Sequence, residues 1–109
     1  MLTKAEQYHR LDAIIHAVCE VGGITYPELI DRKKTLKTNV LRGVAYVISR
    51  YSLIHPSITA SMLCRTRQNV ITVAKNYHKY LQAHDSLTTE YYNRITKKIE
   101  GDGIRITDT

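Results

Sequence analysis

The apolar residues of this chain recur at the spacing of an α-helix, three or four positions apart, through most of its length. In the first segment they are Leu11, Ile14, Ile15 and Val18. A second, longer stripe consists of Val40, Leu41, Val44, Val47, Ile48 and Tyr51. A half-buried strand would instead alternate apolar and polar residues. The pattern therefore predicts an all-α fold of five or six helices, with no dependable strand.

Capping residues and glycines divide this pattern into separate helices. Thr3 and Thr25 each precede a Glu by three residues, a capping-box spacing that satisfies free amides at a helix start. Gly22 and Gly23 end the first helix, because glycine adopts the left-handed cap conformation without strain. The predicted helices cover roughly residues 3–21, 26–31, 38 to just before Pro56, 57–63, 67–83 and 85–100.

The chain has the size of one domain. Its 109 residues, 43% of them apolar, suffice for one modest core. We expect residues 1–100 to form this domain and residues 101–109 to form a loose tail, in which residues 104–107 could pair as a short strand.

The polar N-terminus does not resemble a signal peptide, and no apolar run approaches the roughly 20 residues that span a bilayer. Cys19 and Cys64 form no CxxC pair, which favours buried thiols in a reducing cytoplasm.

Charge is distributed unevenly along the chain, which carries +6 overall. No acidic residue lies between Asp31 and Asp85, a window with ten of the 16 Lys and Arg. The window therefore carries +10 and the remainder −4. Solvated helix faces normally mix both signs, whereas a stretch without carboxylates suits a surface that contacts phosphates. This pattern favours nucleic acid over a membrane surface as partner and indicates a nucleoid-associated cytoplasmic protein, although a merely basic soluble protein would share the net charge.

Residues 57–83 predict a helix–turn–helix inside this window, preceded by an exposed basic loop at residues 32–37. In such motifs the N-terminal part of the second helix enters the major groove of DNA. Arg pairs with guanine, Asn and Gln pair with adenine, and Thr contacts the thymine methyl group. The predicted base-reading residues are Arg65, Arg67, Gln68, Asn69 and Thr72. The predicted phosphate-binding residues are Arg32, Lys33, Lys34, Lys37, Arg42, Thr66, Lys75 and Lys79.

Catalytic patterns are missing from the sequence. The carboxylates flank the basic window without pairing near it, and the five histidines show no HExxH spacing. Neither GxxxxGK[ST] nor GxGxxG occurs, so no loop is predicted to hold a nucleotide. We therefore expect a protein that is not an enzyme and that has no metal and no cofactor.

A helical protein-interaction or dimerisation module is the alternative function. The chain has eight tyrosines but no Phe or Trp, and tyrosine is enriched at protein interfaces. Tyr91 and Tyr92 are adjacent in a predicted helix, so both cannot face one core. The sequence leaves open whether the chain forms a homodimer or binds a partner protein.

The order of these segments resembles the C-terminal DNA-binding domain of the bacterial replication initiator DnaA over roughly residues 11–99. Residues 28–34, Glu-Leu-Ile-Asp-Arg-Lys-Lys, look like the Leu-Leu-Ser-Lys-Arg-Arg stretch of that family. Residues 42–46, Arg-Gly-Val-Ala-Tyr, look like its Arg-Gln-hydrophobic-Ala-hydrophobic helix start, and residues 57–74 match its helix–turn–helix in outline. The resemblance implies a Trp repressor-like helical fold, double-stranded DNA as partner, and a role in replication or transcription control.

The sequence departs from the family where the family reads its binding box. The recognition helix of the family opens with Asp-His-Thr-Thr-Val, whereas the matching stretch here is Arg-Gln-Asn-Val-Ile at residues 67–71. Val40 stands at the position of the Arg in the family's basic loop, and the turn at residues 64–66 has no Gly-Gly. The family's ATPase module is not in this sequence. The resemblance therefore implies a stand-alone relative, from a phage or a mobile element, with a different DNA target.

Overall fold

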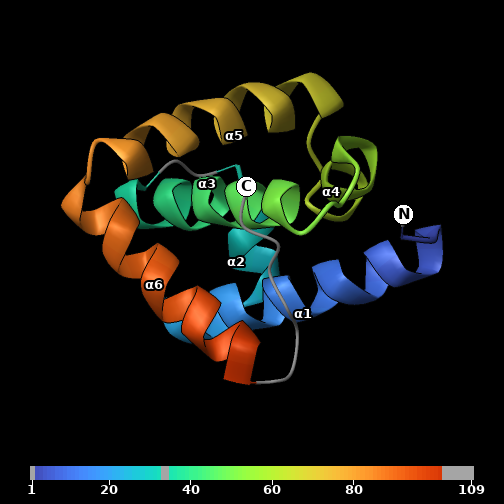
Figure 1. Ribbon diagram of the computed structural model, residues 1–109, viewed down its shortest axis with the longest axis horizontal. Helices are drawn as coiled ribbons and strands as arrows, with labels where there is room; N and C mark the ends of the chain where they lie inside the picture. Colours follow the sequence, from blue (N-terminus) through green and yellow to red (C-terminus); the bar gives the residue numbers. More distant parts are fainter. Residues whose placement is uncertain (1, 33–34, 102–109) are drawn as a thin grey trace.

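Six α-helices follow one another in the computed structural model, which describes residues 2–32 and 35–101 (Figure 1). They are α1 (Lys4–Gly22), α2 (Tyr26–Ile30), α3 (Leu36–Tyr51), α4 (Pro56–Met62), α5 (Arg67–Gln82) and α6 (Ser86–Gly101). No strand occurs within these two ranges, so the predicted all-α fold is confirmed. Gly101 belongs to α6, and the rest of the predicted tail lies outside the described residues.

The capping signals in the sequence correspond to the observed helix starts. The hydroxyls of Thr3 and Thr25 each accept a hydrogen bond from the amide three residues later, and the matching Glu side chains complete both capping boxes. Gly23 has a φ of 65°, the left-handed conformation expected at the end of α1. Local sequence therefore determines where α1 ends and where α1 and α2 begin.

The start of α3 differs from the prediction. Thr35 caps this helix by accepting a hydrogen bond from the amide of Thr38 at 3.2 Å, so Leu36 and Lys37 already belong to its first turn. The expected basic loop at residues 32–37 is therefore helical at its end. The apolar pattern missed this turn because the Leu36 side chain is 72% exposed and adds nothing to the buried stripe.

The central helix of the molecule is α3, and the other five helices all pack against it. In Figure 1 it runs through the middle, with α5 on one side and α1 and α6 on the other. Between Val40 and Tyr51 every residue except Arg50 is buried. Even the hydroxyl of Ser49 is satisfied internally, by donating to the carbonyl of Ala45 at 2.7 Å. One apolar stripe was predicted, but the neighbouring helices bury the rest of this helix as well.

A glycine allows α5 to approach α3 closely. A Cβ atom on Gly43 would lie 2.3 Å from Cδ2 and 2.6 Å from Cγ of the Tyr77 ring. Atoms this close would overlap, and the root of the ring cannot move without shifting α5. The ring of Tyr77 therefore packs directly on the backbone of α3, and this contact sets the distance between the two helices.

The segment from α4 to α5 forms two packed helices joined by a tight turn, as predicted. Cys64 takes the left-handed conformation in this turn, with a φ of 54°, and the amide of Arg65 donates to the carbonyl of Ala60 at 3.0 Å. Thr66 then caps α5 by accepting from the amide of Asn69 at 3.1 Å. The Cys64 side chain is exposed in this turn and Cys19 is half-buried, so the expectation of buried thiols is wrong. A cysteine thus occupies a turn position where glycine would have less strain.

We predict that Gly43→Ala lowers the free energy of unfolding by about 1–3 kcal/mol, because the added methyl group would overlap Tyr77. Urea unfolding followed by circular dichroism measures the change. Gly101→Ala is the matched control, since a Cβ there meets no atom within 4 Å. Equal stability of the Gly43→Ala variant and the parent would contradict this account of the α3–α5 contact.

Candidate nucleic-acid interface

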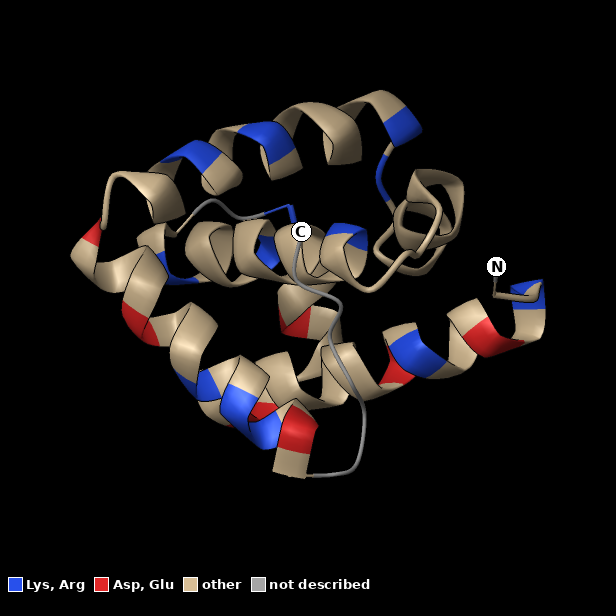
Figure 2. Cartoon of the chain, viewed as in Figure 1, with Lys and Arg blue, Asp and Glu red and all other residues tan. Residues whose placement is uncertain are grey.

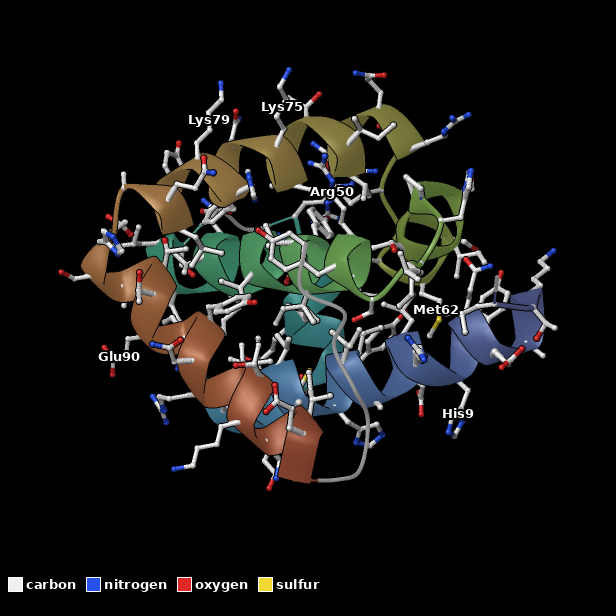
Figure 3. All side chains as sticks on the ribbon, in the orientation of Figure 1. His9, Arg50, Met62, Lys75, Lys79 and Glu90 are labelled. Carbon is white, nitrogen blue, oxygen red and sulfur yellow. The ribbon has the colours of Figure 1, made fainter. Side chains whose placement is uncertain are left out.

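The outer face of α5 is the longest exposed helical surface in the basic part of the chain. This helix packs inward through Val70 and Ala74, which are buried. Figure 3 shows the side chains of Lys75 and Lys79 pointing away from α3. The exposed side chains of α5 belong to Arg67, Gln68, Asn69, Ile71, Thr72, Lys75, Asn76, Lys79, Tyr80 and Gln82. None of them is acidic.

The acidic residues lie on other helices. Figure 2 shows Lys and Arg, without Asp or Glu, along α5, and it shows most acidic positions on α1 and α6. Some of these acidic side chains form ion pairs with basic side chains. Lys98 Nζ lies 3.0 Å from Glu20 Oε1, and this ion pair links α6 to α1. The uneven charge of the sequence thus becomes an uneven charge in space, with α5 on the positive side.

Four of the five predicted base-reading residues are exposed in the first two turns of α5. They are Arg67, Gln68, Asn69 and Thr72. The side-chain amide of Gln68 donates a hydrogen bond to the hydroxyl of Thr72 at 3.3 Å, so these two side chains lie side by side on one face. Lys75, Asn76 and Lys79 continue the same face at helical spacing.

Arg65, the fifth predicted base-reading residue, is half-buried and makes hydrogen bonds within the protein. Its guanidinium donates to four backbone carbonyls, at 3.1–3.3 Å. They belong to Ile30, Asp31, Leu63 and Cys64. These bonds tie the turn before α5 to the end of α2. The side chain therefore supports the turn, and we leave it out of the base-reading set.

Arg42 is the clearest departure among the predicted phosphate-binding residues. Only 6% of it is exposed, and its guanidinium donates to the carbonyls of Leu29 at 2.9 Å and Asp31 at 3.1 Å. It also donates to the side-chain oxygen of Asn39 at 2.7 Å. Burial, followed by the nearby charge of Arg65, lowers the pKa of this guanidinium. The bonds to Leu29 and Asp31 connect α3 to the end of α2.

The remaining predicted phosphate-binding residues divide into two groups. Arg32, Lys37, Lys75 and Lys79 are exposed, and Thr66 is exposed as the N-cap of α5. Lys33 and Lys34 lie outside the described residues. Sequence reasoning gave no role to Arg50, which is exposed on α3 and lines a cavity of about 400 Å³ together with Lys75. The sequence did not indicate that Arg50 lies beside Lys75, because the two residues are far apart in the chain and are brought together only by the packing of α5 on α3.

No group of three or more His, Cys, Asp or Glu that could hold a metal ion occurs among the residues whose positions are given. No helix in the described ranges is both long and apolar enough to cross a bilayer. Comparison with protein-family models, with curated proteins and with solved structures found no match to this chain.

We predict that Arg42→Ala lowers the free energy of unfolding by about 2–4 kcal/mol, because it removes three internal hydrogen bonds and leaves a void between α2 and α3. Arg67→Ala removes the same charge from an exposed position and should change stability by less than about 0.5 kcal/mol. Denaturant unfolding of both variants checks this contrast. Similar small changes in the two variants would show that the buried guanidinium does not hold the fold together.

Proposed function

We propose that this protein binds double-stranded DNA through the outer face of α5. One observation carries the proposal: an exposed helical face combines base-pairing side-chain types at its N-terminal end with two lysines further along, and has no carboxylate. A protein that only needed solubility would mix acidic and basic residues there. A face that contacts phosphates excludes carboxylates, because they would be repelled.

The first two turns of α5 would enter the major groove, which is wide enough to admit a helix. Arg67 would pair with guanine, and Gln68 or Asn69 with adenine. Thr72 and the 38% exposed Ile71 would offer apolar contacts to thymine methyl groups. Because these types discriminate between bases, the proposed binding is sequence-specific.

Lys75 and Lys79 would contact phosphates that flank the groove, and Arg32 would contact the backbone near the N-terminus of α5. All three are exposed, and Arg32 lines the same cleft as Thr66 and Asn69. Phosphate contacts fix the orientation of a protein on DNA, while base contacts select the sequence. This division of labour matches the two kinds of side chain on α5.

We further propose that the chain is a relative of the C-terminal domain of DnaA that acts on DNA in replication or transcription control. The support is the order of segments in the sequence and the agreement of Glu28–Lys34 and Arg42–Tyr46 with the patterns of that family. The changed residues at the start of α5 argue for a target other than the standard initiator box.

Duplex binding should weaken with salt. If about six phosphates are neutralised, the logarithm of the binding constant should fall against the logarithm of salt concentration with a slope near −5. Lys75→Ala and Lys79→Ala should each reduce the steepness by about 1. Arg94→Ala, which removes an exposed charge from α6, is the control and should leave the slope unchanged. A flat salt dependence would rule out DNA binding of this kind.

Selection of bound duplexes from a random pool should enrich a defined motif, and the double variant Arg67→Ala with Gln68→Ala should lose that enrichment. Each lost base contact is worth about 1–3 kcal/mol of discrimination. Size-exclusion chromatography of the same variant tests the rival function. If the variant lost an oligomer while duplex binding stayed unchanged, the interaction-module hypothesis would replace the DNA-binding one.

A further inference from the structure

A cleft of about 600 Å³ opens between α3 and the N-terminal half of α5. The turn before α5 and the end of the α2 segment close its other sides. Among the described residues, its lining contains three arginines, two amide side chains and two tyrosines, but no Asp or Glu. The arginines are Arg32, Arg42 and Arg65. This cleft adjoins the outer face of α5 and shares Asn69 with it.

Two of these arginines bring their charges close together without a carboxylate as hydrogen-bond acceptor. Arg42 and Arg65 both donate to one oxygen, the carbonyl of Asp31, each at 3.1 Å. Every acceptor of these guanidinium groups in the described part of the chain is an uncharged oxygen. Asp31 favours the charged form of Arg42, but it ranks last among the influences on that pKa. Arginine stays protonated in proteins, so the cleft holds excess positive charge.

A buried hydroxyl without a partner lines the same cleft. Tyr46 is 2% exposed, and among the described residues its oxygen has no hydrogen-bond partner. Side chains in a helix lean toward the N-terminus, so Tyr46 leans toward Arg42, one turn earlier. Burial raises the pKa of this hydroxyl, and the nearby charges of Arg65 and Arg42 oppose the rise. Buried hydroxyls are rarely left unpaired, so this donor points to a ligand oxygen as acceptor.

The N-terminus of α5 supplies further donors. Thr66 and Asn69 line the cleft, and the hydroxyl of Thr66 accepts from the amide of Asn69. The first amides of a helix have no acceptor within the helix, and they carry the positive end of its dipole. Guanidinium groups, a helix N-terminus and a phenolic hydroxyl thus face one space.

We propose that this cleft binds a phosphoryl group. Guanidinium groups and helix N-termini are the usual ligands of phosphate oxygens in proteins. A phosphoryl dianion matches the two charges of Arg42 and Arg65, whereas a single carboxylate would match only one. Val73 and Tyr77 provide an apolar wall against which the body of a phosphomonoester can pack. The group could come from a small molecule or from the DNA backbone, and the inference holds whether or not the outer face of α5 binds DNA.

Titration of the full chain with sodium phosphate, against sodium chloride at equal ionic strength, tests the proposal. Amide chemical shifts of residues 66–69 should change in a saturable way with phosphate only. Tyr46→Phe should weaken phosphate binding about tenfold, the effect of one hydrogen bond to a charged group. Without phosphate this variant should be at least as stable as the parent, because the hydroxyl has no partner in the fold.

Thr59→Val is the matched control. Among the described residues, Thr59 also has a buried hydroxyl without a partner and is 1% exposed. It lines the cavity of about 400 Å³, which Tyr46 also borders but Arg42 and Arg65 do not. Its removal should leave phosphate affinity unchanged. Shifts that grow linearly and equally in phosphate and chloride would overturn the proposal. Unchanged phosphate affinity in Tyr46→Phe would overturn it as well.

Repetition of the titration with duplex bound identifies the source of the phosphoryl group. Weaker phosphate binding in the complex would assign the cleft to a backbone phosphate of DNA. Unchanged affinity would assign it to a small phosphorylated molecule that binds alongside DNA. Because the first titration contains no DNA, its result stands apart from any failure of the proposed DNA binding.

Discussion

The packing of α5 against α3 is the contact on which the rest of the candidate surface depends. Gly43 permits it, because the ring of Tyr77 lies where a side chain at this position would stand. Val70 and Ala74 are buried in the same interface. With these residues turned inward, helical geometry places the polar side chains of α5 outward. One close approach between two helices therefore determines both the exposed face and the cleft beside it.

Two arginines, one buried and one half-buried, join the short α2 segment to this pair of helices. Arg42 reaches from α3, and Arg65 reaches from the turn before α5. Both end at the carbonyl of Asp31, just after α2. The hydroxyl of Tyr26 donates a hydrogen bond to the carbonyl of Met62, which ties the start of α2 to α4. The segment before α3 and the start of α5 are thus held by one set of hydrogen bonds, although more than thirty residues separate them in sequence.

Local signals predicted most of the fold. Thr3, Thr25 and Gly23 act through neighbouring backbone atoms, so their sequence context was sufficient. The roles of Arg42 and Arg65 could not be predicted in this way, because their acceptors are backbone carbonyls supplied by distant residues. A charged side chain is almost never buried unless it is paired, and carbonyl acceptors leave no trace in sequence. The burial of Tyr46 could not be predicted either, because helices distant in sequence pack around it.

The first turns of α5 have a consequence for how such a protein can diversify. Arg67, Gln68 and Thr72 are exposed, and none of them packs in the core or caps a helix. The stability of the domain rests instead on α3, on Gly43 and on the arginines tied to backbone carbonyls. Substitutions on the outer face can therefore accumulate at little cost to folding. Because the stabilising residues and the exposed residues are different ones, one scaffold can carry many different recognition surfaces.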